Sequence, residues 1–270
     1  MGQYRRKPLR YMVYALLTLL VACGISTGTQ PPDSSSAPVT LTVSAAASLN
    51  QVLPAIAKLW EQETGNRVMI NLGSTGQLAQ QIERGAPVDL FVAADTKSIE
   101  DLETKALVFS ETKTLYGVGR ITLWQREDSS FPIKDLQDLT RSEIERIAIA
   151  NPDHAPYGIA AKQALQSIGI WDEIQPKLVL GENIRQTQQY AETGNVDVAI
   201  VALSLSLNRP GQWLLISEDL HQPIEQMLVV PKTAQHPEIA EQFALFINSP
   251  KSRPFMQKHG FILPEEDSLK

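Results

Sequence analysis

Four short segments of the chain could bind an anion, because each joins a strand-like run to a helix-like run. The first ends at Ser48 after three alanines, and the second places Ser74 and Thr75 between two glycines. The third covers residues 151–158 and the fourth residues 181–185. Backbone N–H groups at the start of a helix lack partners within the helix, and the helix dipole favours negative charge there. Each segment alone also fits an ordinary capped helix, so it is their number that favours an anion site.

The first of these segments organises the rest of the chain. Residues 40–43 predict a buried strand, and from Leu49 to Trp60 apolar residues recur at helical spacing. Ser48 then falls where the N-cap of that helix is expected, since a serine oxygen accepts hydrogen bonds from free N–H groups. The small alanines before it let a ligand approach the backbone closely.

Residue sets that carry catalysis or metal binding are absent from the sequence. There is no phosphate-binding loop with a Gly-Lys-Ser/Thr ending, no Gly-x-Ser-x-Gly elbow and no His or Cys pair at metal-ligand spacing. The four histidines lie far apart, and we interpret His154 with its neighbour Asp153 as a solvent-exposed loop pair because no nucleophile is near. The sequence therefore predicts a protein that is not an enzyme and has neither a metal site nor a cofactor.

The N-terminus predicts export. Residues 1–22 combine a positive start with an apolar run that is too short for a comfortable span of about 20 residues, which is typical of a signal peptide. The run ends in Leu-Val-Ala-Cys23, which resembles a bacterial lipobox, so we expect Cys23 to be lipidated. The alternative is that Cys23 is an incidental residue of a cleaved signal. Residues 23–38 are rich in Ser, Thr, Gly, Gln and Pro and predict a flexible tether.

From residue 39 onward the composition is that of a globular α/β protein. Strand-like and helix-like runs alternate, which predicts a mostly parallel sheet with helices on both faces. Residues 115–124 and 224–230 are expected to cross between two lobes. The formal net charge of −6 argues against a nucleic-acid partner.

At the four turns the chain resembles the molybdate-binding proteins of bacterial ABC importers, which are type II periplasmic binding proteins. The matching stretches are residues 43–49, 73–82, 85–95, 151–165 and 259–261. The resemblance covers essentially residues 39–263. It implies two α/β lobes joined by two crossing segments, with lobe I formed by residues 39–119 plus 226–270 and lobe II by residues 120–225. In this family the lobes close on a tetrahedral oxyanion.

The resemblance also implies a set of ligand-binding residues. Ser48 and Thr75 would donate side-chain hydroxyls, and Tyr157 and Ile184 would donate backbone N–H groups. Some members place a tyrosine where this chain has Ala202, so that contact is either absent or supplied by Tyr157. The turns aim no carboxylate at the anion, and we expect the two nearby cations, Lys162 and Arg185, on the solvated sides of their helices.

The function that follows is capture of molybdate or tungstate and its delivery to the permease and ATPase of an importer. The protein would act as a monomer in the periplasm or on the outer face of the cytoplasmic membrane, anchored through Cys23. One alternative is the same scaffold binding sulfate or thiosulfate. An exported α/β hydrolase is opposed by the missing nucleophile, and a ligand-sensing domain of a regulator is opposed by the export signal.

Overall fold

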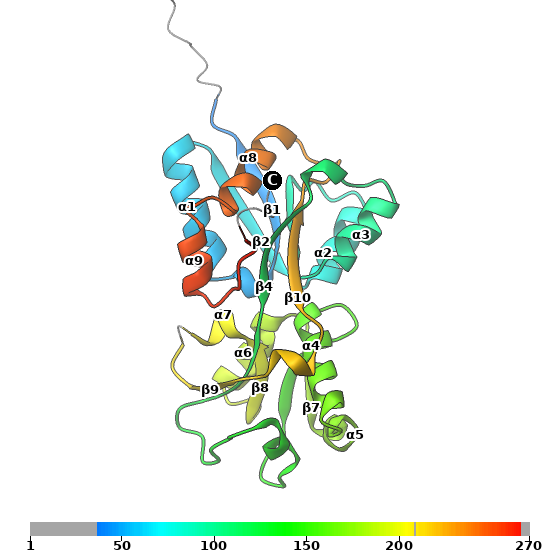
Figure 1. The fold of residues 1–270 in the computed structure, drawn as a ribbon, viewed down its shortest axis with the longest axis vertical. Helices are drawn as coiled ribbons and strands as arrows, with labels where there is room; N and C mark the ends of the chain where they lie inside the picture. The colour runs from blue at the N-terminus through cyan, green and yellow to red at the C-terminus, as the bar shows by residue number, and fades with distance from the viewer. Residues whose placement is uncertain (1–36, 208, 266–270) are drawn as a thin grey trace, which may run out of the picture. The chain divides into compact units, whose positions relative to one another are not determined.

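Two five-stranded sheets with flanking helices make up the part of the protein that the structure describes (Figure 1). It is a computed structural model that describes residues 37–207 and 209–265. The signal peptide, the lipidation site at Cys23 and the tether up to residue 36, all predicted from the sequence, lie outside the described residues.

The first sheet has the strand order β2-β1-β3-β10-β4. β1 runs parallel to β2 and β3, whereas β10 runs antiparallel to β3 and β4. Its strands are β1 (Thr40–Ala46), β2 (Arg67–Gly73), β3 (Leu90–Val92), β4 (Thr114–Gly119) and β10 (Ile224–Val229). Its helices are α1 (Val52–Thr64), α2 (Thr75–Glu83), α3 (Lys97–Thr104), α8 (Pro237–Ile247) and α9 (Arg253–Lys258).

The second sheet has the order β7-β6-β8-β5-β9. β6 runs parallel to β7 and β8, and β5 runs antiparallel to β8 and β9. Its strands are β5 (Ile121–Gln125), β6 (Ile147–Ala150), β7 (Leu178–Gly181), β8 (Val198–Ala202) and β9 (Gln212–Leu215). Its helices are α4 (Pro156–Ser167), α5 (Trp171–Ile174), α6 (Ile184–Glu192) and α7 (Leu203–Ser206).

The α/β class is confirmed, but each sheet is mixed where the sequence predicted a mostly parallel one. The antiparallel strands are those that carry the chain between the sheets. The predicted crossing segment at residues 115–124 consists of β4 in the first sheet and β5 in the second, joined at Arg120. The segment at 224–230 contains β10, by which the chain returns to the first sheet.

Each sheet has its own apolar core. In the first, Trp60 of α1 packs against Phe243 of α8, with ring centroids 5.0 Å apart. In the second, all five residues of β8 are buried, because helices cover a central strand on both faces. These cores hold the carboxyl ends of the parallel strands, and thus the turns that follow them, in fixed positions.

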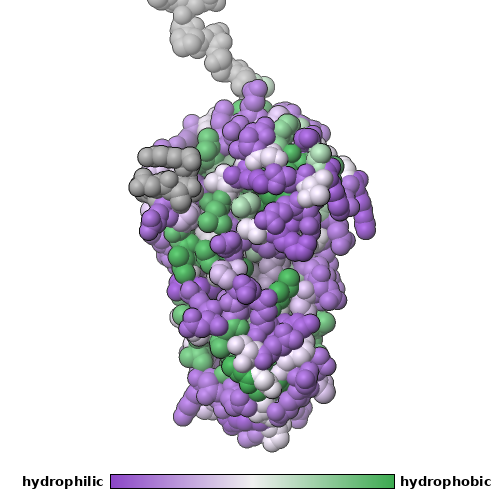
Figure 2. Space-filling model, turned by 45° about the vertical axis from the view of Figure 1, so that its right-hand side comes forward, coloured by the Kyte–Doolittle hydropathy of each residue, from purple (hydrophilic) through white to green (hydrophobic). Residues whose placement is uncertain are grey.

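The face shown in Figure 2 is mostly hydrophilic, with hydrophobic residues in small separate groups. Among the described helices, none is both long enough and apolar enough to cross a bilayer.

Candidate functional site

A small cavity lies where the four predicted anion-binding turns meet. In both sheets the turns follow parallel strands, whose carboxyl ends are the usual place for ligands in α/β folds. The cavity is lined by Ala46, Ala47, Ser48, Gly73, Ser74, Thr75, Ala94, Ala155, Pro156, Tyr157 and Ile184. The structure thus brings together all four residues that the sequence singled out. Residues from both sheets contribute to the lining, so the site depends on both.

The cavity has a volume of about 10 Å³. A buried water molecule needs about the same space. Ligands of the size of sugars, amino acids or peptides are therefore excluded. A tetrahedral oxyanion is also larger than a water molecule, so its binding would require the surrounding turns to move outward.

Ser48 lies in a different local structure from the one predicted. It is the middle residue of a 3-10 turn (Ala47–Leu49), and α1 begins only at Val52 with Gln51 as its N-cap. The prediction that Ser48 caps the helix is therefore wrong, because a separate turn comes between strand and helix. Its hydroxyl, in a residue 1% exposed, has no hydrogen-bond partner within the described residues. A buried polar group without a partner is costly, so this hydroxyl is available to a ligand.

Thr75 is the first residue of α2, and its hydroxyl oxygen already accepts one hydrogen bond. Oγ1 accepts a hydrogen bond from the Ala94 N–H at 2.9 Å, which leaves the hydroxyl proton free to donate. The position before it, Ser74, is the N-cap but makes no side-chain cap bond. Thr75 thus faces the cavity as a donor whose acceptor capacity is largely satisfied.

Tyr157 and Ile184 offer backbone N–H groups at two helix starts. α4 begins with Pro156, which has no N–H, so Tyr157 carries the first donor of that helix. At α6 the Asn183 side chain accepts from the N–H groups of residues 185 and 186, at 3.1 Å each, and leaves that of Ile184. Across the described chain, neither the Tyr157 nor the Ile184 N–H has a protein acceptor. Both are therefore free to bind an anion.

The Tyr157 side chain is part of a chain of buried hydrogen bonds that the sequence did not reveal. Gln226 of β10 donates from Nε2 to the Tyr157 hydroxyl at 2.7 Å. On its other side, the Tyr116 hydroxyl of β4 lies 2.7 Å from Gln226 Oε1 and 2.8 Å from the Ala93 carbonyl oxygen, so its single proton is shared between these two acceptors. The polar Gln226 within an apolar crossing strand was the one available signal.

Burial keeps both phenols neutral. It raises the pKa of Tyr157 to about 12, against the opposing effect of the nearby Ser48 hydroxyl and of the hydrogen bond from Gln226. Ser48 Oγ is close enough for this influence on the pKa but completes no hydrogen bond of normal geometry. Burial also raises the pKa of Tyr116 well above its usual value. Gly119 must lack a side chain, because a Cβ there would overlap the Tyr157 hydroxyl.

The cavity lining carries no charged side chain. Arg185 is exposed, and the Lys162 ammonium lies over the Trp171 ring, 5.3 Å from its centroid, so neither cation lines the cavity, as predicted. Ala202 is fully buried and is not part of the lining. The site therefore offers neutral donors, which suits an oxyanion that carries no proton of its own.

His154 is not the solvent-exposed loop residue that the sequence analysis expected. Its side chain is 16% exposed, and its Nδ1 lies 2.8 Å from the Ser74 hydroxyl oxygen. Its Nε2 is 3.8 Å from Glu182 Oε2. The prediction failed because the partners lie 80 and 28 positions away in sequence; only Asp153 is exposed as expected.

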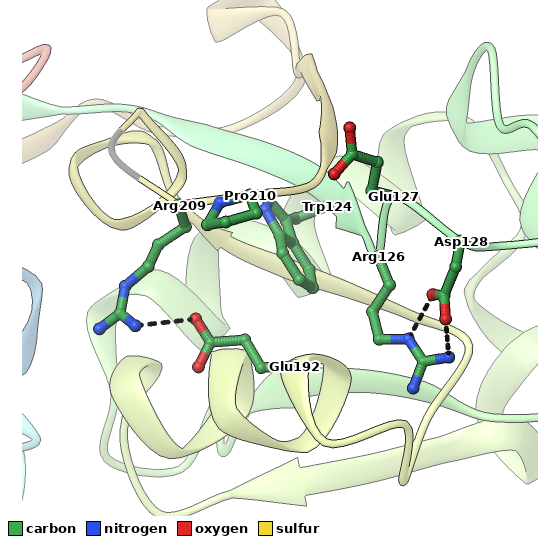
Figure 3. A pocket seen from close by; sticks show the side chains of 7 residues that line it. All are labelled: Trp124, Arg126, Glu127, Asp128, Glu192, Arg209 and Pro210. Atoms are coloured by element: carbon green, nitrogen blue, oxygen red, sulfur yellow. Dashed lines mark hydrogen bonds and ion pairs between the residues drawn. The ribbon is translucent and has the colours of Figure 1, made fainter.

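A second, larger cavity lies beside Trp124, at the edge of the second sheet (Figure 3). Its volume is about 510 Å³, and charged side chains line it. Arg126 pairs with Asp128 at 2.7 Å, and Arg209 lies 3.6 Å from Glu192. Within residues 37–207 and 209–265, no cluster of three or more His, Cys, Asp or Glu side chains is placed to hold a metal ion.

The chain is similar to known proteins over most of its length. Residues 41–262 match the family described as bacterial extracellular solute-binding protein. The chain is 32% identical over 224 residues to the molybdate-binding protein ModA of Rhodobacter capsulatus, which covers 82% of this chain and 88% of that protein. It is 30% identical over 257 residues to a Bacillus subtilis protein named "Putative ABC transporter substrate-binding lipoprotein YvgL", covering 93% of this chain and 98% of that one.

Among solved structures, the fold is similar to the periplasmic molybdate-binding protein of Azotobacter vinelandii. The TM-score is 0.78 at 29% sequence identity, over 83% of this chain and 100% of that chain.

Proposed function

Because the chain belongs to the bacterial extracellular solute-binding proteins, we propose that it captures molybdate or tungstate and delivers the ion to an ABC importer. The observation that carries this proposal is the donor set around the small cavity. The unpartnered hydroxyl of Ser48, the free proton of Thr75 and the N–H groups of Tyr157 and Ile184 all belong to residues that line it. The names of the relatives from Rhodobacter and Azotobacter support the same ligand.

The chemistry of the donors favours a fully deprotonated dianion. Phosphate at neutral pH keeps a proton that needs an acceptor, and the cavity lining has no carboxylate, only hydroxyl oxygens such as Ser48 Oγ, which are weaker acceptors. Sulfate has no such proton but is smaller, so some donors would lie beyond hydrogen-bonding reach, and bonds left unmade in a closed site are costly. We expect molybdate and tungstate to bind about equally, sulfate well below them, and phosphate weakest.

We assign the two lobes of the binding mechanism to the two sheets. Lobe I comprises residues 39–119 plus 226–270 and lobe II residues 120–225, with hinges where β4 meets β5 and at the start of β10. An anion held by donors from both lobes binds the closed arrangement more tightly and so shifts the population toward it. Small-angle scattering with and without saturating molybdate tests this; identical dimensions would rule out the closing motion.

For the cellular setting, we propose a monomer tethered to the membrane through a lipid on Cys23, with the importer's permease and ATPase as partners. The support is the lipobox-like sequence before Cys23 and the lipoprotein name of the Bacillus relative. Cys23→Ser should release the protein from the membrane fraction. Mass spectrometry of the mature wild type that finds Cys23 unmodified, or removed with the signal, would refute the anchor.

A thermal-melting panel with molybdate, tungstate, sulfate and phosphate tests the ligand assignment. Ligand at about a thousand times its Kd adds roughly 4 kcal/mol to stability by mass action, so a cognate ion gives a large shift. Equal stabilisation by phosphate would require an acceptor in the cavity and would contradict the donor-only site. Stabilisation led by sulfate would keep the site and change the cargo.

A further inference from the structure

We propose that His154 is a closure latch, a positioning residue that holds three of the four anion-binding turns together without contacting the anion. This inference rests on the proposed function for its purpose but on separate contacts for its evidence. His154 belongs to the third turn and is not among the residues that line the cavity. Its neighbours Ala155, Pro156 and Tyr157 are.

The first part of the latch joins the third turn to the second. His154 Nδ1 lies 2.8 Å from Ser74 Oγ, and the backbone N–H of Gly76 donates to the His154 carbonyl oxygen at 2.9 Å. The approach is so close that a Cβ on Gly76 would lie 2.8 Å from that oxygen. The two bonds flank Thr75, so they fix the position of its hydroxyl relative to the N–H of Tyr157.

The second part joins the fourth turn to the other two. Glu182 Oε2 accepts from Gln77 Nε2 at 2.7 Å and lies 3.8 Å from His154 Nε2. Glu182 lies two residues before Ile184, and Gln77 lies two residues after Thr75. The second turn starts α2 of the first sheet, whereas the other two start α4 and α6 of the second (Figure 1). Every one of these contacts except that between His154 and Glu182 therefore crosses between the sheets.

The closed site would then have two groups of residues with different roles. The lining donors determine the selectivity for the ion, and the latch determines the lifetime of the closed form around it. A net hydrogen bond of ordinary strength corresponds to about a tenfold change in an equilibrium constant. Loss of the His154 side chain should therefore lower the ratio of closed to open molecules about tenfold. In ligand exchange, the same loss should raise the dissociation rate and leave the association rate nearly unchanged.

Spin-label distances measure this ratio directly. The full chain with Cys23→Ser receives labels at Gln81→Cys on α2 and Gln189→Cys on α6, both exposed positions on opposite sides of the cavity. His154→Ala should shift the distance distribution toward the open form with and without molybdate. His154→Asn, which can keep a bond to Ser74, should restore much of the closed population. His236→Ala, a histidine outside the cavity lining and the latch contacts, is the matched control.

Gln77→Ala tests the latch without altering His154 and should lower the closed ratio about threefold, since it removes one bond between exposed groups. The latch is overturned if His154→Ala leaves the ratio unchanged, if His236→Ala lowers it equally, or if the wild type shows one distance under all conditions. A wild type that binds none of the oxyanions while its ratio still responds to His154 would refute the proposed function and leave the latch standing.

Discussion

Two cavities in the described part of the protein, the one beside Trp124 and the one at the four turns, differ in volume and in charge, the properties usually taken to mark an anion site. The one beside Trp124 has a volume of about 510 Å³ and contains two arginines (Figure 3). The one at the four turns has a volume of about 10 Å³ and no charged side chain. Nevertheless, the small cavity is the one that we propose as the anion site, because its lining holds the free donors.

The difference lies in which polar groups already have partners. In the large cavity Arg126 and Arg209 each face a carboxylate, so their charge is largely neutralised. In the small one, the Ser48 hydroxyl and two helix-start N–H groups have no acceptor within the described residues. Free donors have no protein partner to give up when an anion arrives, whereas an arginine in an ion pair must first give up its carboxylate.

The largest expected effect comes from removing the side-chain donors of the small cavity. Ser48→Ala and Thr75→Ala should each weaken molybdate binding about tenfold to a hundredfold. A hydrogen bond to a charged group is worth roughly 1.5–3 kcal/mol. Titration calorimetry measures the loss, with Thr104→Ala, an exposed threonine on α3, as the matched control. Wild-type affinity in both variants would remove these residues from the site and break the comparison.

The second effect is on stability at high pH. The pKa of Tyr157 is about 12 in the folded protein and about 10 in the unfolded chain. Between these values the unfolded chain loses its proton while the folded protein keeps it. Stability present below about pH 10 should therefore fall as the pH rises toward 12, by about 1.4 kcal/mol for each pH unit. Urea unfolding at pH 8, 10 and 11 measures the decline, which Tyr157→Phe should reduce. A flat profile in the wild type would show that the phenol titrates normally.

A third, smaller effect separates the two roles of Tyr157. Tyr157→Phe keeps the backbone N–H but leaves the buried Gln226 amide without its acceptor, so stability should fall by about 1–3 kcal/mol. Molybdate affinity should change by less than about threefold. Tyr190→Phe, on the partly exposed face of α6, serves as the control. A loss of affinity as large as that of Ser48→Ala would mean that the hydroxyl touches the anion and supplies the contact that Ala202 lacks.

Local sequence patterns were sufficient to predict the four strand-to-helix turns and the helix after Ser48, which begins at Val52. They were insufficient for strand direction, because β4 and β10 look like any apolar strand, and only their connections make them antiparallel to their neighbours. β9 was missed entirely, since its four residues are exposed and show no alternation. The short helix α7 after Ala202 was missed because four residues are too few to show a helical period.

At the site, the residue types were predictable and their hydrogen bonds were not. Ser48 was expected as a helix cap and instead keeps its hydroxyl free, because Asn50 and Gln51 continue the turn before α1. The contacts of His154 and Gln226 were not predicted, because their partners are distant in sequence. His154 bonds to Ser74, 80 positions away, and Gln226 to Tyr157, 69 positions away. Such pairs emerge only when both sheets are in place.

The smallest expected effect concerns the cavity beside Trp124. It tests whether this larger cavity contributes to anion binding. Arg209→Gln and Arg126→Gln each remove one positive charge from the larger cavity. Both ion pairs are partly exposed, and pairs of this kind contribute about 0–1 kcal/mol to stability. Molybdate affinity should stay within about twofold of wild type, because neither arginine lines the small cavity. Calorimetry at low and high salt distinguishes a contact from a general attraction: a loss that disappears in high salt reflects only the long-range field. A tenfold loss that persists in high salt would mean that the anion binds beside Trp124, and the roles of the two cavities would have to be exchanged.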